Sequence, residues 1–254
     1  MPDKQIAVIG AIDSSGGAGI NQDIRVAALL GHQPEVCVSA VTLQDENGVK
    51  DIYPVPLSQF QDNLRHILAN PELRYIKIGA LCHPEQIKAL ITQLSQARTL
   101  KIVLDPVIKP SLGKAFLRAE DIDLMLKLIC HADYVCPNRP ELELLCSANI
   151  GDFNEAISAA KTLNLQTRTS VLVKGGHAAS DDIPEALICK DIVYRFSFPR
   201  RAWKYDHGTG CAFATAFTCQ LARGVAAREA FARASDWVRG FFDELNADHS
   251  PKLV

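Results

Sequence analysis

Long hydrophobic runs and basic clusters are both missing from this 254-residue sequence. The first apolar stretch, Ile6 to Ile12, is interrupted by Gly10 and is too short for a membrane span or the core of a signal peptide. The 27 lysines and arginines are balanced by 29 acidic residues, and no basic run is long enough for a nucleic-acid footprint. We therefore expect a cytoplasmic protein that binds neither membranes nor nucleic acid.

Cysteine pairs at metal-binding spacing are also missing. The sequence holds eight cysteines, and no two of them form the C-x-x-C pair that zinc sites usually need. We expect reduced and mostly buried thiols without disulfides, because a chain of this length can be stabilised by its core alone. The cysteines lie at positions 37, 82, 130, 136, 146, 189, 211 and 219.

No internal repeat, low-complexity linker or shift in composition divides the chain. Its 48% hydrophobic content is enough for a substantial core. Short apolar segments alternate with segments of helical spacing, which predicts an α/β fold. We expect a single domain over residues 1–254, with a possible small flap at residues 48–55 that lies apart from the main sheet.

Two nucleotide-binding fingerprints are missing from the first glycine-rich loop. A predicted strand over Gln5 to Ile9 is followed by the loop Asp13 to Gly19 and by a predicted helix over Ile20 to Leu30. The glycines are spaced G-G-x-G, and no P-loop lysine follows, which disfavours a nicotinamide dehydrogenase or a Walker-type ATPase. We interpret Asp13 and the loop N–H groups as a site for a small substrate, with a plain tight turn as the alternative.

A second glycine loop, Lys204 to Cys211, leads into an alanine-rich segment that predicts a helix. The unpaired N–H groups of a helix start attract anions, and the glycines of the loop let a phosphoryl group approach the backbone. Cys211 is expected at the positive end of the helix dipole, where a thiol ionises more readily than its reference pKa of about 8.5 suggests. It is a candidate base. A glycine turn with a buried cysteine is the alternative.

Polar side chains follow two of the predicted strands. Gln44 comes directly after the strand Glu35 to Leu43, and its amide can pair with a heterocycle that shows a donor beside an acceptor. Asp105 follows the nearly all-apolar strand Lys101 to Leu104, at the ligand edge of a parallel sheet. A solvated turn residue is the alternative for Gln44, and a helix cap or loop turn is the alternative for Asp105.

Two further groups suit phosphate chemistry. Lys174 follows the strand Ser170 to Val173 and precedes two glycines, so its ammonium can lie against transferring phosphates. Asn138 and Glu141 stand at a predicted helix start and can hold hydrated magnesium, which needs few protein oxygens. A surface lysine and a helix capping box are the respective alternatives.

Taken in order, these segments resemble the ribokinase-like superfamily and, within it, the hydroxymethylpyrimidine/phosphomethylpyrimidine kinases of thiamin biosynthesis. The resemblance covers nearly the whole chain. The stretches that carry it are Asp13 to Ile20, Gln44 with Asn47 to Val49, Lys77 to Gly79, Asp105 to Val107, Pro137 and Asn138 with Glu141, Val173 to His177, and His207 to Cys211.

The resemblance implies a three-layer α/β/α sandwich with a mostly parallel sheet, forming a homodimer. It implies an enzyme that transfers the γ-phosphate of ATP, with Mg²⁺, to a hydroxymethyl group and then to the resulting monophosphate. In this pattern Gln44 reads the pyrimidine, and Gly208, Thr209, Gly210 and Cys211 form the anion hole and the base. On this basis we assign Asp13, Gly17, Ala18, Gly19, Gln44 and Val107 to the substrate, Lys174, Gly176, Gly208 and Gly210 to the nucleotide phosphates, and Asp105, Asn138 and Glu141 to ATP and magnesium.

Departures from the family pattern bear on the choice of substrate. Asp45-Glu46 stands where smaller or neutral polar residues are common, Lys109-Pro110 where a flexible stretch is usual, and Tyr205-Asp206 where Asn-Thr is more frequent. A pyridoxal or pyridoxine kinase is the first alternative function, because the ring of that substrate also carries a hydroxymethyl group. A nucleotide-binding regulator without turnover is the second.

Overall fold

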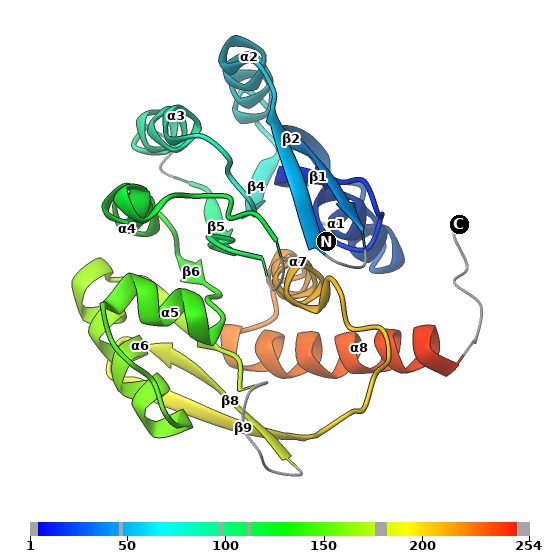
Figure 1. The fold of residues 1–254 in the computed structure, drawn as a ribbon, viewed down its shortest axis with the longest axis vertical. Helices are drawn as coiled ribbons and strands as arrows, with labels where there is room; N and C mark the ends of the chain where they lie inside the picture. The colour runs from blue at the N-terminus through cyan, green and yellow to red at the C-terminus, as the bar shows by residue number, and fades with distance from the viewer. Residues whose placement is uncertain (1–4, 46–47, 97–98, 111–112, 176–181, 248–254) are drawn as a thin grey trace.

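The computed structural model describes residues 5–45, 48–96, 99–110, 113–175 and 182–247. These residues form a nine-stranded sheet with the strand order β3-β2-β1-β4-β5-β6-β7-β8-β9. Figure 1 shows helices α2 to α6 along one side of the sheet and helices α1, α7 and α8 along the other. The predicted three-layer α/β/α sandwich is therefore confirmed, with both faces of the sheet covered by helices.

The elements alternate along the chain as the sequence predicts. The strands are β1 (Gln5–Asp13), β2 (Glu35–Asp45), β3 (Gly48–Pro54), β4 (Leu73–Ile78), β5 (Lys101–Leu104), β6 (Tyr134–Val135), β7 (Ser170–Val173), β8 (Asp182–Cys189) and β9 (Ile192–Pro199). The α-helices are α1 (Gly19–Leu29), α2 (Leu57–Leu68), α3 (Pro84–Leu94), α4 (Ile122–Ile129), α5 (Arg139–Cys146), α6 (Phe153–Thr167), α7 (Thr209–Ala222) and α8 (Ala227–Ala247).

The middle of the sheet is parallel and its edges are antiparallel. Strand β1 pairs in parallel with β2 and β4, and the parallel pairing continues through β5 and β6 to β7. At one edge β3 runs antiparallel to β2, and at the other β8 and β9 form an antiparallel pair beside β7. The carboxyl ends of the parallel strands consequently meet at one edge of the sheet, which is where open α/β sheets bind ligands.

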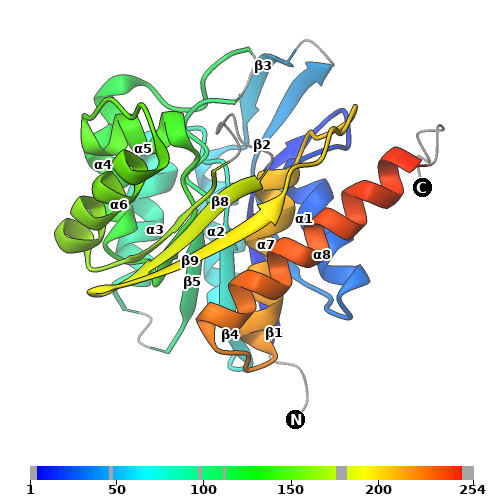
Figure 2. The same ribbon diagram turned by 90° about the horizontal axis from the view of Figure 1, so that it is seen from below.

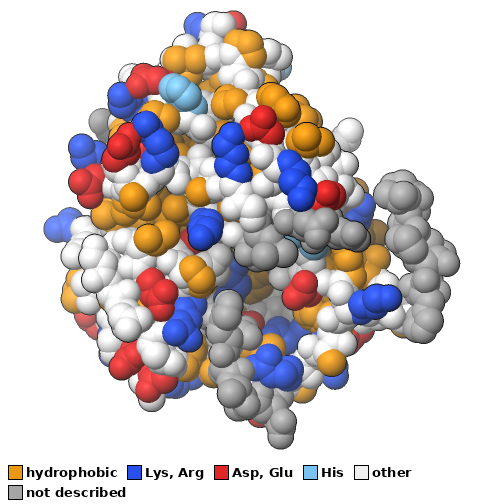
Figure 3. Space-filling model, in the orientation of Figure 1, with side chains coloured by type: hydrophobic (Ala, Val, Ile, Leu, Met, Phe, Trp, Pro, Cys, Tyr) orange, Lys and Arg blue, Asp and Glu red, His pale blue; other side chains and the backbone are white. Residues whose placement is uncertain are grey.

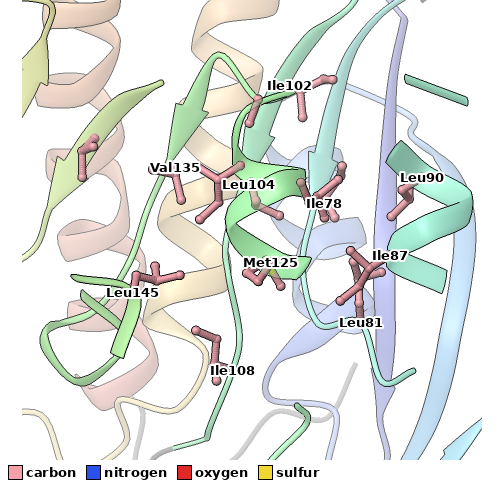
Figure 4. Close-up of a cluster of buried hydrophobic side chains, with 14 of the residues drawn as sticks. Ile78, Leu81, Ile87, Leu90, Ile102, Leu104, Ile108, Met125, Val135 and Leu145 are labelled. Atoms are coloured by element: carbon pink, nitrogen blue, oxygen red, sulfur yellow. The ribbon is translucent and has the colours of Figure 1, made fainter. Parts of the chain in front are cut away.

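Strand residues alternate between the two helix layers because successive strand side chains point to opposite faces. In β5, Ile102 and Leu104 pack into the core shared with α2 to α6, whereas Val103 packs against α7 and α8. Figure 4 shows the first core, where Leu104 lies beside Val135 of β6 and Met125 of α4. Figure 2 shows α7 and α8 on the opposite side from α4, α5 and α6.

The structure corrects the expectation for residues 48–55. Strand β3 pairs with β2 from Ala40 opposite Pro54 to Asp45 opposite Gly48, so it is an edge strand of the main sheet. The prediction that this segment lies apart from the sheet is wrong. Strand β1 pairs with β2 only as far as Thr42, and the β2–β3 hairpin continues past that point over the ligand edge.

The exterior carries charges of both signs. Figure 3 shows acidic and basic side chains interspersed over the face seen in Figure 1. None of the described helices combines the length and the apolar character that a membrane span requires. The eight cysteines are free thiols.

Candidate active site

Six of the residues assigned from the sequence lie at the carboxyl edge of the sheet. Asp13 is the last residue of β1, and Gln44 lies next to the end of β2. Asp105 and Lys174 follow the last residues of β5 and β7, and Asn138 with Glu141 begins α5 just after β6. The parallel strands in the middle of the sheet thus place at one edge residues that are far apart in the sequence.

Asp13 is the centre of a hydrogen-bonded cluster. Its carboxylate accepts from the backbone N–H and the hydroxyl of Ser15, both at 2.7 Å, and from the N–H of Ala18 at 2.7 Å. His207 Nε2 lies 3.0 Å from Oδ2 of the same carboxylate. Burial by itself raises the pKa of Asp13, but the hydrogen bonds from His207 and Ser15 outweigh it and hold the pKa well below its usual value. Asp13 is therefore a fixed negative charge that shapes the loop.

Gln44 faces the same cluster. Its Nε2 lies 3.5 Å from Nε2 of His207, and its backbone N–H donates to the hydroxyl of Ser14 at 3.0 Å. The side chain is half-buried, so its amide has room for a further partner. Val107 packs on a small apolar cluster formed by Ala11, Ala40 and Ala80.

The two glycine loops touch each other. A Cβ on Gly208 would lie 2.0 Å from the carbonyl oxygen of Gly17, and a Cβ on Gly17 would lie 2.3 Å from the hydroxyl of Tyr205 and 2.6 Å from the His207 ring. Gly208 also has a φ of +87°, which favours glycine. These contacts bring the start of α7 against the Asp13 loop.

The start of α7 has no side-chain cap. The N-cap residue Gly208 has no side chain that could cap the helix, and Thr209, Gly210 and Cys211 form the first helical turn. Such N–H groups lack partners within the helix, and the helix dipole adds positive potential. The predicted anion site therefore has the expected local structure.

The structure corrects the expected ionisation of Cys211. The residue keeps partial solvent exposure, but the protein atoms packed around its sulfur raise the pKa of the thiol to about 12. Desolvation outweighs the favourable charge of Lys77 and the hydrogen bond from the N–H of Gly19. Placement at the helix start is confirmed, whereas the expectation of a readily ionised thiol is wrong.

Lys174 lies near both the start of α7 and the carboxyl groups of Asp105 and Glu141. Its ammonium would be 3.3 Å from a Cβ on Gly210. Burial opposes its charge, but Asp105 and Glu141, with Cys136, raise the pKa of Lys174 and keep it protonated. Burial and then the charge of Asp105 raise the pKa of Glu141. Two carboxyl groups and one ammonium thus share a largely buried region beside the α7 start.

Asn138 and Glu141 form a capping box, which confirms the structural alternative for this pair. The Glu141 N–H donates to Asn138 Oδ1 at 2.9 Å, and the Asn138 N–H donates to Glu141 Oε2 at 2.9 Å. The second oxygen of Glu141 is 3.4 Å from the N–H of Ile108. The capping role leaves each oxygen a further lone pair, so it is compatible with a cation nearby. Gly176 lies outside the described residues.

Sequence reasoning missed three contributors. His207 belongs to the quoted glycine motif, but nothing in its spacing predicts the contact with Asp13. Tyr205 stands out only as a departure from the family pattern, and its hydroxyl lies against Gly17. Lys77 belongs to a quoted segment without an assigned role, and it is buried in an ion pair with Asp23 of α1.

The loop that carries His207 is tied to the end of α8. Oδ1 of Asn246 accepts from the N–H groups of Lys204 and Tyr205, both at 2.9 Å, and its Nδ2 donates to the carbonyl of Tyr205 at 2.9 Å. Trp203 Nε1 donates to Asp243 at 2.8 Å. The last turns of α8 therefore fix the approach to Gly208.

The amino-acid sequence of this chain is similar to those of known kinases. The sequence pattern of the phosphomethylpyrimidine kinase family matches residues 13–251. The chain belongs to this family. It is 33% identical over 243 residues to the hydroxymethylpyrimidine/phosphomethylpyrimidine kinase of Haemophilus influenzae, covering 92% of this chain and 89% of that protein. It is also 34% identical over 239 residues to the thiamine biosynthesis bifunctional protein ThiED of Geobacter sulfurreducens; that match covers 94% of this chain but only 49% of the relative, so the chain spans about half of that protein's length.

A pyridoxal kinase has the same fold as this chain. The structure of pyridoxal kinase from Staphylococcus aureus in complex with AMP-PCP and pyridoxal superimposes with a TM-score of 0.85 at 26% identity, covering 94% of this chain and 87% of that one. The ribokinase-like architecture inferred from the motifs is therefore confirmed, and the chain belongs to a family of phosphotransferases.

Proposed function

We propose that this protein phosphorylates the hydroxymethyl group of 4-amino-5-hydroxymethyl-2-methylpyrimidine with ATP and then phosphorylates the resulting monophosphate, in thiamin biosynthesis. Membership of the phosphomethylpyrimidine kinase family supports the reaction class. The single observation that carries the proposal is the contact between the two glycine loops, Gly17 against Gly208. This contact places the half-buried amide of Gln44 beside the start of α7, which has no side-chain cap. A ring bound by Gln44 would present its hydroxymethyl group toward that helix start.

In this proposal the residues of α7 stabilise charge. Phosphoryl transfer has a loose transition state with negative charge on its equatorial oxygens, so the main contribution of the protein is positioning and electrostatic stabilisation. The N–H groups of Gly210 and Cys211 and the ammonium of Lys174 supply positive potential from two sides. Gly17, Ala18 and Gly19 bring the backbone close to the pyrimidine, and Thr209 begins the helix that holds the anion.

The residues of the sheet edge suit a hydrated divalent cation. Among the described residues no group of three or more His, Cys, Asp or Glu side chains is arranged to hold a metal directly. Asp105 and Glu141 are nonetheless two buried carboxyl groups; burial first, and then repulsion by Asp105, raise the pKa of Glu141, and a cation would relieve that repulsion. We propose that Asp105 and Glu141, with Asn138, hold magnesium partly through water. Bound magnesium would neutralise charge on the phosphates of ATP.

A pyridoxal kinase is the second candidate, favoured by the structural likeness to the Staphylococcus aureus enzyme. Hydroxymethylpyrimidine, its monophosphate, pyridoxal and pyridoxine should be compared as acceptors in one ATP-consumption assay. We expect the highest kcat/KM for the two pyrimidines. A higher kcat/KM for pyridoxal would reject the first assignment in favour of the second, and no ATP consumption with any acceptor would favour a regulator.

Gln44→Ala is expected to lower kcat/KM for the pyrimidine by about 10-fold to 100-fold, because losing a paired amide costs about 1 to 3 kcal/mol. The KM for ATP should stay within about threefold, since the amide faces the Asp13 cluster, away from Lys174. Steady-state kinetics in both substrates measures both values. Gln61→Ala on the exposed side of α2 is the control and should change neither. An unchanged kcat/KM for the pyrimidine in Gln44→Ala would remove this residue from the substrate site.

Glu141→Gln is expected to raise the magnesium concentration for half-maximal rate by about 3-fold to 10-fold. Glutamine can keep the capping hydrogen bond to the Asn138 N–H, so the change mainly removes the carboxylate that would face a bound cation. The rate is measured against free magnesium at saturating ATP. The matched control is Asp152→Ala, which removes the N-cap of α6, where Asp152 accepts from the N–H groups of Asn154 and Glu155. It should lower the Tm without moving the magnesium curve. If Glu141→Gln behaves in the same way, its role is capping alone.

The proposal also covers the number of domains, the oligomeric state and the location in the cell. We propose that the chain is a single domain, acts as a homodimer and resides in the cytoplasm. The continuous sheet supports the first. Sedimentation of the purified protein tests the second.

A further inference from the structure

A fully buried ion pair lies directly behind the start of α7. Lys77 of β4 and Asp23 of α1 are both 0% exposed, and Nζ of Lys77 donates to both carboxylate oxygens of Asp23 at 3.0 and 2.9 Å. The same carboxylate accepts at 2.7 Å from the hydroxyl of Thr215, which is also buried. One charged cluster thus links β4, α1 and α7.

Stability alone does not explain this pair. Removing two charges from water costs several kcal/mol per ion, and well-packed apolar residues of similar size are often as stabilising or more so. The surroundings are apolar, because Tyr75, Phe213 and Phe217 belong to the core on this side of the sheet. An apolar pair of the same shape would fit such a core, so the retained charges point to another role.

The position of the pair relates it to the candidate active site. Thr215 lies one helical turn after Cys211 on α7, so the hydroxyl that holds Asp23 also fixes the first turns of that helix. Gly79, two residues after Lys77 at the end of β4, has no side chain, and a Cβ there would lie 2.8 Å from Nζ of Lys77. The ammonium is thereby directed toward the ligand edge of the sheet.

The charge of Lys77 interacts with Cys211 and Asp105 at that edge. Burial opposes protonation, but Asp23 first, and then Cys211 and Asp105, raise the pKa of Lys77, so the ammonium stays charged. In the reverse direction burial raises the pKa of the Cys211 thiol, and the charge of Lys77 is the largest effect that lowers it. In a buried region with a low effective dielectric, such a charge acts more strongly than in water.

We propose that Lys77 is a positioning residue of the active site: a buried, fixed cation that Asp23 and Thr215 hold behind the first turn of α7, where it stabilises negative charge on Cys211 and on the transferring phosphoryl group. The inference rests on the proposed function of that helix start. In this proposal the buried ammonium of Lys77 supplies part of the charge stabilisation that would otherwise come from the N–H groups of α7 alone.

The test replaces both charges by apolar side chains of similar shape, in the double variant Asp23→Leu with Lys77→Met. Because no charge is left unpaired, the Tm should stay within a few degrees of the wild type. We expect kcat to fall by about 10-fold to 100-fold, while the KM values for ATP and for the pyrimidine stay within about threefold. The control is Lys101→Met with Asp133→Asn, which removes an ion pair 2.6 Å apart at the amino ends of β5 and β6, the edge of the sheet opposite the ligand edge. Its kcat should stay within about twofold.

A second readout needs no substrate. The alkylation rate of Cys211 by iodoacetamide, followed on its peptide by mass spectrometry, should fall by about 10-fold in the double variant, because a thiolate without Lys77 forms less readily. Thr215→Val keeps both charges and removes only the hydroxyl, so it serves if the double variant does not fold; kcat should fall by about threefold or more.

The outcomes separate this inference from the function on which it rests. An unchanged kcat in the folded double variant, or in Thr215→Val if the double variant does not fold, overturns the role of Lys77. A lower kcat with a much lower Tm and an unchanged alkylation rate also overturns it, because the pair is then only structural. If the wild type phosphorylates none of the acceptors, the proposed function fails, and the alkylation rate alone still decides whether Lys77 acts on Cys211.

Discussion

Replacing Cys211 with alanine is expected to lower kcat by about 100-fold while the KM for ATP stays within about threefold. Alanine keeps the helix start and its N–H groups, so the proposed anion site remains, but the side chain that we propose as proton acceptor for the substrate hydroxyl is lost. General-base assistance is typically worth about 10² to 10⁴ in rate. The value should lie at the lower end, because in phosphoryl transfer positioning and charge stabilisation contribute most.

The pH profile gives the sharper result. Since the pKa of the Cys211 thiol is raised to about 12, the thiolate fraction grows about tenfold for each pH unit below that value. The wild-type kcat/KM should therefore rise with pH from 7 to 10 without a plateau, and the alanine variant should lack this rise. The profile is measured with both proteins in the same buffers. Full activity of Cys211→Ala with an unchanged profile would leave Cys211 as a small residue that merely fits the turn.

Gly208→Ala is expected to lower kcat/KM by about 100-fold or more. The new Cβ would lie 2.0 Å from the carbonyl oxygen of Gly17, so the two loops must separate and the helix start must move away from the substrate loop. A misplacement of about 1 Å can cost about 100-fold in rate. Steady-state kinetics with ATP and the pyrimidine measures the loss.

Gly224→Ala is the matched control for this substitution. Gly224 follows the C-cap of α7 with a φ of +82°, close to the +87° of Gly208, but nothing lies within 4 Å of its added Cβ. Both variants share the backbone strain of about 1 kcal/mol, which corresponds to a fall of about 2 to 4 °C in Tm. Only Gly208→Ala should lose activity. Equal kinetics in the two variants would show that the contact between the loops is not needed for catalysis.

The order of the elements was predictable from the sequence because parallel strands buried on both faces leave compact apolar segments. Lys101 to Leu104 and Ser170 to Val173 are such segments, and their predicted limits match β5 and β7. Helix α4 was not predicted, although Asp123 and Lys127 stand four residues apart in the otherwise apolar segment Ile122 to Ile129 and so mark one polar helix face. The edge strand β3 was misjudged, since its alternation fits a separate hairpin as well as a sheet edge.

The position of the candidate residues was predictable where they stand near the end of a strand. Asp13 and Gln44 lie in the last residues of β1 and β2, and Asp105 and Lys174 directly follow β5 and β7, so the sheet gathers them at one edge. The ionisation of Cys211 was not predictable, because it depends on how many atoms of other elements pack around the sulfur. The contact of Asp13 with His207 joins residues whose separation along the chain carries no periodic signal.

The hydrogen bonds of Asn246 give helix α8 a role beyond packing. Its amide holds the backbone of Lys204 and Tyr205 and lies in the last turn of α8. A shortened form of the protein that ends before Asn246 would keep the residues assigned to substrate and nucleotide, yet the loop leading to Gly208 would lose its anchor. Trimming the chain, or joining another protein to this helix, is therefore expected to disturb the loop that leads to Gly208.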